Sequence, residues 1–158
     1  MNNGIIFNNR IIDLVFVSMF IAQFLKIFSP IFKKRKPTFS LLFETGGMPS
    51  SHSASVSSLC TSVAIIYGVD SVYFAISFVL ATIVMYDATG IRREAGKHAK
   101  ALNQLLFENK KDIFETKQFK EFKEFLGHTP LEVLAGCILG VVVTMFLSGY
   151  LLWKKDLM

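Results

Sequence analysis

Two histidines, each at the start of an apolar segment, are the residues in this sequence best suited to chemistry. His52 ends the run Gly46-Gly-Met-Pro-Ser-Ser-His, and His128 precedes Thr-Pro-Leu-Glu132. An imidazole can attack phosphorus or give a proton to a leaving oxygen. If both histidines meet at one membrane surface beside basic residues, the pattern indicates phosphoryl chemistry.

The residues before His52 predict the start of a helix. Pro49 suits a first helical turn, and Ser50 and Ser51 are good capping types. Unpaired N–H groups at a helix start attract anions, so His52 would lie within reach of a bound phosphate. The alternative, which the spacing leaves equally open, is a capped helix whose serines and histidine satisfy only one another.

Glu132 has two predicted roles that the spacing does not separate. Thr129-x-x-Glu132 is a capping box with Pro130 at the first helical position, so the carboxylate can accept from the backbone N–H of Thr129. It can also accept from a ring nitrogen of His128, which would fix the tautomer and raise the nucleophilicity of that imidazole.

Cations are needed as well, because a pentacoordinate phosphorus transition state spreads negative charge over its equatorial oxygens. The candidates are Arg92 and Arg93, just after the third apolar segment, and Lys36 in the basic cluster 33–36. A guanidinium can hold two phosphate oxygens at once. For a single lysine such as Lys36, the common alternative is a role as an orientation signal only.

The sequence gives no support for a metal, nucleotide or other cofactor site. It has no Cys/His cluster, Walker loop or Gly-x-Gly-x-x-Gly. Cys60 and Cys137 fall inside apolar segments, which is typical of small core residues rather than of a disulfide. We expect the third histidine, His98, to be exposed to solvent.

Composition and hydropathy predict an all-α integral membrane bundle that forms a single domain over residues 1–158. The chain is 52% hydrophobic with a mean hydropathy of +0.46, which is too apolar for a soluble domain of this size. We expect about four membrane helices and an uncleaved first span; the candidate segments are 11–28, 53–67, 72–86 and 131–153. The last of these has the ~20 apolar residues that a crossing usually needs.

The distribution of charge predicts a multi-pass orientation with both histidine motifs in the cytoplasm. If all four segments cross, the two linkers on one face, 29–52 and 87–130, hold 13 basic residues and the other face holds 3. Positive charge marks the cytosolic side of membrane proteins. The net charge of +5 is therefore explained without nucleic acid as a partner.

The long linker 87–130 contains two further helical patterns. Apolar residues recur every three or four positions from Ala88 to Leu106, so the third helix should continue past the membrane and end near Asn109. Three phenylalanines then alternate with lysines over 117–125, which is typical of an amphipathic helix on an anionic leaflet. A helix packed against its own domain is an equally open alternative.

The chain resembles the divergent branch of the type 2 phosphatidic acid phosphatase (PAP2) superfamily, which is related to acid phosphatases and vanadium haloperoxidases. Three stretches carry the resemblance: residues 46–54 (GGMPSSHSA), 86–96 (YDATGIRREAG) with Leu102-Asn103, and 126–136 (LGHTPLEVLAG). The resemblance as a whole extends over most of the chain, from the first apolar segment through Gly140.

The resemblance implies metal-independent cleavage of phosphomonoesters or diphosphates through a phosphohistidine. His128 would be the nucleophile, Glu132 its partner and His52 the acid, while Ser50 and Ser51 would bind phosphate. The sequence departs from the superfamily pattern in three ways. Ser51 replaces a glycine; the Ser-Arg pair expected before the nucleophile falls on Glu121-Phe122; and the leading lysine of the first motif falls on Ser29.

The function expected from these residues is that of a membrane phosphohydrolase whose substrate carries its phosphate on a lipid or on a soluble molecule. The first alternative is a non-catalytic membrane protein that binds or moves a phosphate-bearing lipid or anion, which the missing motif arginine favours. The second is a structural or assembly factor with a relic site. The sequence leaves a homo-oligomer open.

Overall fold

The protein is all-helical over the residues that its computed structural model describes, which are 4–28, 47–105, 122 and 127–152. This confirms the predicted fold class. Six helices follow one another along the chain: α1 Arg10–Leu25, α2 Ser51–Tyr67, α3 Val72–Thr89, α4 Ile91–Asn103, α5 Pro130–Phe146 and α6 Ser148–Leu152.

The predicted segments agree with the helices to within a few residues, with one difference at the C-terminal end. A single 3₁₀ turn extends α1 to Phe28, and α2 begins two residues before the predicted segment. The predicted segment 131–153 is instead two helices, because the chain turns at Leu147 between α5 and α6.

Two stretches are long and apolar enough to cross a membrane, Arg10–Phe28 and Val72–Asn103, while Pro130–Phe146 is apolar but shorter. The molecule thus has candidate membrane-spanning helices, and the number of four spans stays a prediction. The second stretch includes α4, so the third helix does continue as expected. The predicted end at Asn109 and the amphipathic pattern over 117–125 lie outside the described residues, apart from Phe122.

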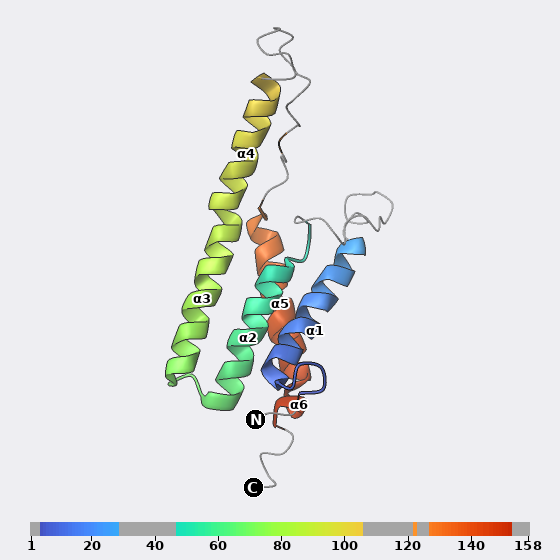
Figure 1. Cartoon of the computed structure of the whole chain (residues 1–158), viewed down its shortest axis with the longest axis vertical. Coiled ribbons are helices and arrows are strands. Elements are labelled where there is room, and N and C mark those ends of the chain that lie inside the picture. The colour runs from blue at the N-terminus through green and yellow to red at the C-terminus, as the bar shows by residue number, and fades with distance from the viewer. Residues whose placement is uncertain (1–3, 29–46, 106–121, 123–126, 153–158) are drawn as a thin grey trace.

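Helix α2 lies at the centre of the bundle and packs against α1, α3 and α5. Figure 1 shows that α2 and α5 both begin at the end of the bundle where α1 finishes, while the α2–α3 turn and α6 lie at the opposite end. Helices α3 and α4 form one long arm that extends beyond the bundle. The arrangement therefore gathers the starts of two helices and the end of a third at one place.

The contact between α2 and α5 is close because two glycines of α5 face the backbone of α2. A Cβ at Gly136 would clash with the carbonyl oxygen of Ser50, and one at Gly140 would clash with that of Ala54. Small residues four apart let membrane helices approach in this way. One turn farther on, Ser58 Oγ and Thr144 Oγ1 share a buried 2.8 Å hydrogen bond, which fixes the register of the pair.

On the side of α1 that faces the bundle, buried residues recur every four positions. Leu14, Ser18, Ala22 and Lys26 are all buried, and they share one helix face because positions four apart lie one above the other. The α1 helix packs on α2. This register brings Lys26, at the end of α1, to the first turn of α2.

Candidate functional site

The start of α2 is capped and is tied to the start of α5. Ser50 is the N-cap residue, and its side-chain oxygen accepts from the backbone N–H of Ser53 at 3.3 Å. Its own N–H donates to the carbonyl oxygen of Glu132 at 3.0 Å. Ser50 is fully buried, so its polar groups serve the junction between the two helices.

His128 is held between the end of α3 and the start of α5. Gly127, with φ of 87°, adopts a backbone conformation that favours glycine, and it turns the chain directly before the histidine. The N–H of His128 donates to the carbonyl oxygen of Ala88 on α3 at 2.9 Å. The side chain is only 4% exposed, so the ring is fixed within the fold.

Both predicted contacts of Glu132 occur in the structure, and one carboxylate oxygen makes both. Oε2 accepts from the backbone N–H of Thr129 at 3.1 Å, and the Thr129 hydroxyl accepts in return from the Glu132 N–H, which completes the capping box. The same oxygen lies 3.2 Å from Nδ1 of His128. The carboxylate favours a proton on Nδ1, which leaves the lone pair of His128 on Nε2.

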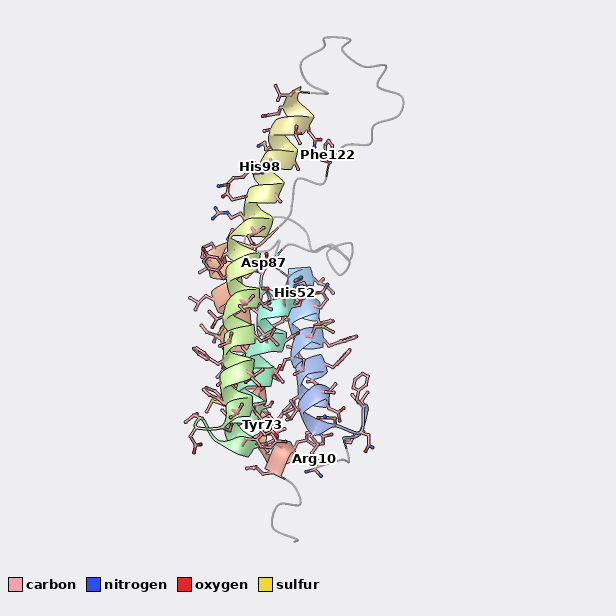
Figure 2. The ribbon with its side chains drawn as sticks, turned by 60° about the vertical axis from the view of Figure 1, so that its left-hand side comes forward. Arg10, His52, Tyr73, Asp87, His98 and Phe122 are labelled. Carbon is pink, nitrogen blue, oxygen red and sulfur yellow. The ribbon has the colours of Figure 1, made fainter. Side chains whose placement is uncertain are left out.

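The two imidazoles, 76 positions apart in the sequence, lie side by side. Their ring centroids are 6.4 Å apart with an angle of 59° between the planes. His52 is exposed, and Figure 2 shows it at the end of the bundle remote from Arg10 and Tyr73. Nε2 of His128 is buried and has no hydrogen-bond partner within the described part of the chain.

Lys26 is a residue of this site that the sequence analysis missed. It is 1% exposed, and its Nζ donates to the Oγ of Ser51 at 3.5 Å. Its charge also interacts with the carboxylate of Glu132. A buried lysine is unusual without such partners. The sequence analysis overlooked it because it lies within an apolar segment. The pattern that could have identified it is the four-residue spacing of the bundle-facing positions of α1, which ends at this lysine.

The remaining predicted phosphate-binding residues lie in different places. Ser51, 7% exposed, is in the first turn of α2 beside Lys26. The backbone of Arg92 lies in α4, and its side chain is outside the described part of the structure. Arg93 is exposed on α4. Lys36 also falls outside the described residues.

Two further observations complete the description of the site. His98 is exposed on α4, as expected, and Figure 2 shows it on the arm beyond Asp87, away from the bundle end where His52 lies. Within residues 4–28, 47–105 and 127–152, no three His, Cys, Asp or Glu side chains gather as a metal site would require. The groups that the structure does bring together are two imidazoles, a carboxylate, a lysine and the capped start of a helix.

The chain is similar to known proteins over most of its length. Residues 7–143 match the family described as "Divergent PAP2 family". The chain is 42% identical over 138 residues to the "Uncharacterized membrane protein YuiD" of Bacillus subtilis (strain 168), an alignment that covers 82% of this chain and 87% of that protein. No solved structure matches the chain significantly.

Proposed function

The chain belongs to the divergent PAP2 family, and from this membership we propose that it is a membrane phosphohydrolase that uses a histidine nucleophile and no metal. One observation carries the proposal: the ring of His128 has Nδ1 on the Glu132 carboxylate, Nε2 without a partner among the described residues, and the ring of His52 beside it. A carboxylate, an oriented imidazole and a second imidazole are the groups that a two-step phosphoryl transfer needs.

The proposed reaction has two steps that share these groups. Nε2 of His128 attacks phosphorus, a P–N bond forms and the P–O bond to the leaving group breaks, while protonated His52 gives its proton to the leaving oxygen. Water then attacks the phosphohistidine; neutral His52 takes a proton from that water, and the P–N bond breaks to release phosphate. Glu132 holds the imidazolium that forms on His128.

The site must open slightly for this reaction. Nε2 of His128 has no accessible surface, so a substrate has to displace a covering group before phosphorus can reach it. In this proposal the exposed His52 ring moves as substrate binds. Catalytic contacts often tighten only in the substrate complex.

Phosphate release by the purified protein in detergent or in liposomes tests the proposal directly. The substrates should include a phosphomonoester and a diphosphate, each in a lipid form and a soluble form. Release of inorganic phosphate in the presence of a metal chelator is the expected result. Saturable binding of these compounds with no product would contradict the hydrolase proposal.

That second outcome would support the alternative, a non-catalytic membrane protein that binds or moves a phosphate-bearing lipid or anion. One observation favours it: Arg93, a predicted replacement for the missing motif arginine, is exposed on α4, and no contact joins it to His128 or Glu132 among the described residues. Lys26 and the N–H groups at the start of α2 would be enough to hold an anion, whereas a phosphoryl transition state gains from more positive charge.

We expect Lys26 to supply charge for phosphate binding in either case. Replacing it with methionine keeps most of the volume and removes the ammonium, and a lost charge-assisted hydrogen bond should weaken phosphate binding about 10-fold to 100-fold. The measurement is the inhibition constant of inorganic phosphate, or its dissociation constant if no turnover is found. Lys97→Met is the matched control, because Lys97 is exposed and pairs with Glu94. Equal phosphate affinity in both variants would exclude Lys26 from the site.

We also propose that the protein crosses the membrane several times with the site on the cytoplasmic side. The support is the contact between the two histidine rings, with His52 at one end of the bundle. The sequence of the linkers 29–52 and 87–130, which hold 13 basic residues, also favours a cytoplasmic side for this end. A cysteine at the exposed Lys97, in a variant lacking Cys60 and Cys137, should resist a membrane-impermeant thiol reagent in intact cells and react after lysis. A cysteine at Asp70, in the α2–α3 turn, should react in intact cells. The reverse labelling pattern would show that the site lies on the outer side of the membrane and would contradict the proposed orientation.

A further inference from the structure

Asn103, at the end of α4, holds a distant part of the chain through both groups of its side chain. Nδ2 donates to the carbonyl oxygen of Phe122 at 2.8 Å, and Oδ1 accepts from the N–H of Phe122 at 2.9 Å. The two residues are 19 positions apart, and Asn103 is 8% exposed. One buried carboxamide thus satisfies both backbone groups of a single residue, as a neighbouring strand would.

The chain returns to the same arm six residues later. The N–H of His128 donates to the carbonyl oxygen of Ala88, near the end of α3. Figure 1 shows α3 and α4 as one arm, and Figure 2 shows Phe122 beside α4. The α3–α4 arm therefore has two attachment points for the chain, Asn103 for Phe122 and Ala88 for His128.

The two attachment points lie far apart along the arm. Fifteen residues of helix separate Ala88 from Asn103, a rise of about 22 Å. Phe122 and His128 are six positions apart, and a chain of that length can reach at most about 20–22 Å. Because the two lengths are similar, the position of Phe122 limits where His128 can sit.

We propose that Asn103 is a positioning residue for His128: by fixing Phe122 on α4, it sets the placement of the His128 ring against that of His52. The capping box of α5 and the bond from Nδ1 to Glu132 are local to residues 128–132, and both survive the loss of Asn103. The separation of the two rings is the quantity that changes. The consequence for turnover rests on the proposed function, whereas the placement of the ring does not.

The test of placement uses full-length protein in membranes and needs no activity. In a variant lacking Cys60 and Cys137, cysteines replace His52 and His128, and a short bifunctional thiol reagent joins them. Asn103→Leu keeps the size of the side chain and removes both hydrogen bonds. Two ordinary hydrogen bonds correspond to about a tenfold change in the equilibrium constant for docking Phe122 on α4, so cross-linking should slow by up to about tenfold.

Three further variants make the result specific. Gln104→Leu, at the exposed next position, should leave the cross-linking rate unchanged. Asn103→Asp keeps the acceptor and loses the donor, so its rate should be intermediate. Phe122→Pro removes one N–H from the other side of the contact, and it should also slow the reaction. Unchanged cross-linking in folded Asn103→Leu would overturn the proposal, and if that variant does not fold, unchanged cross-linking in Phe122→Pro would do so.

A kinetic measurement on the protein with its histidines intact complements the cross-linking. Lys26 and Ser51 lie on other elements and still bind phosphate in Asn103→Leu, so kcat should fall while KM stays within about twofold. Slower cross-linking without turnover in any form would refute the hydrolase proposal and leave the positioning role intact. A rise in KM with kcat unchanged would refute a role that acts through His128.

Discussion

Replacing His128 with glutamine should lower kcat for a phosphate ester by at least about three orders of magnitude, because removing a nucleophile leaves only binding and electrostatic effects. Glutamine is close in size to histidine and can still bond to Glu132, so the start of α5 should remain folded. A second readout is the covalent intermediate: labelled phosphate should attach to the parent protein in an alkali-stable, acid-labile form and should be absent from the variant.

The matched control is His98→Gln, which changes the exposed histidine of α4 and should leave turnover within about twofold. The contrast matters because His128 is buried and His98 is not. Thermal stability of both variants, measured in the same detergent, separates loss of chemistry from loss of fold. Full activity in folded His128→Gln would eliminate the phosphohistidine mechanism.

Replacing Gly136 and Gly140 together with alanine should destabilise the protein strongly. Each new Cβ would clash with a carbonyl oxygen of α2, and backbone cannot move aside as a flexible side chain can. Overpacking typically costs about 1–3 kcal/mol per site, which exceeds the gain of about 1 kcal/mol from alanine in a helix. Because Gly136 faces Ser50, separation of the helices would also displace the site. The measurement is thermal unfolding in detergent.

Gly149→Ala provides the control, since a Cβ at Gly149 would meet nothing within 4 Å. This single change adds one methyl group to α6 without a clash, so the unfolding temperature should stay the same or rise slightly. If the double variant unfolds at the temperature of the parent, the close contact between α2 and α5 is not required for stability.

The helices could be predicted from the sequence because apolar runs and capping residues are local signals. Ser50 and Ser51 marked the start of α2, and Thr129-Pro130 marked the start of α5. Pro49 does not stand in the first turn of α2 as expected, because it precedes the N-cap Ser50. The break at Leu147 was missed because the surrounding run is apolar and has no Pro, although Ser148-Gly149 directly after it is a turn-type dipeptide. The close packing at Gly136 also needed the structure, since a glycine in a helix does not reveal which backbone it approaches.

The site was predictable in part, for the same reason. The two histidines and Glu132 stood out by type and by spacing. Lys26 did not, because its meaning depends on how α1 packs against the first turn of α2, which is a tertiary contact. Asn103 stood out only as part of the family resemblance. Its contact could not be predicted, because its partner Phe122 is 19 positions away and is bound through its backbone, so that the side-chain type of Phe122 carries no signal.

The double duty of a single oxygen of Glu132 limits what that residue can reveal about relatives. A lineage that abandoned hydrolysis would still need a carboxylate there to begin α5 correctly, so its retention is no diagnostic of an enzyme. By contrast, Nε2 of the buried His128 makes no structural hydrogen bond among the residues described. A relative without catalytic activity should therefore be recognised by replacement of the residue at His128 while the residue at Glu132 is retained.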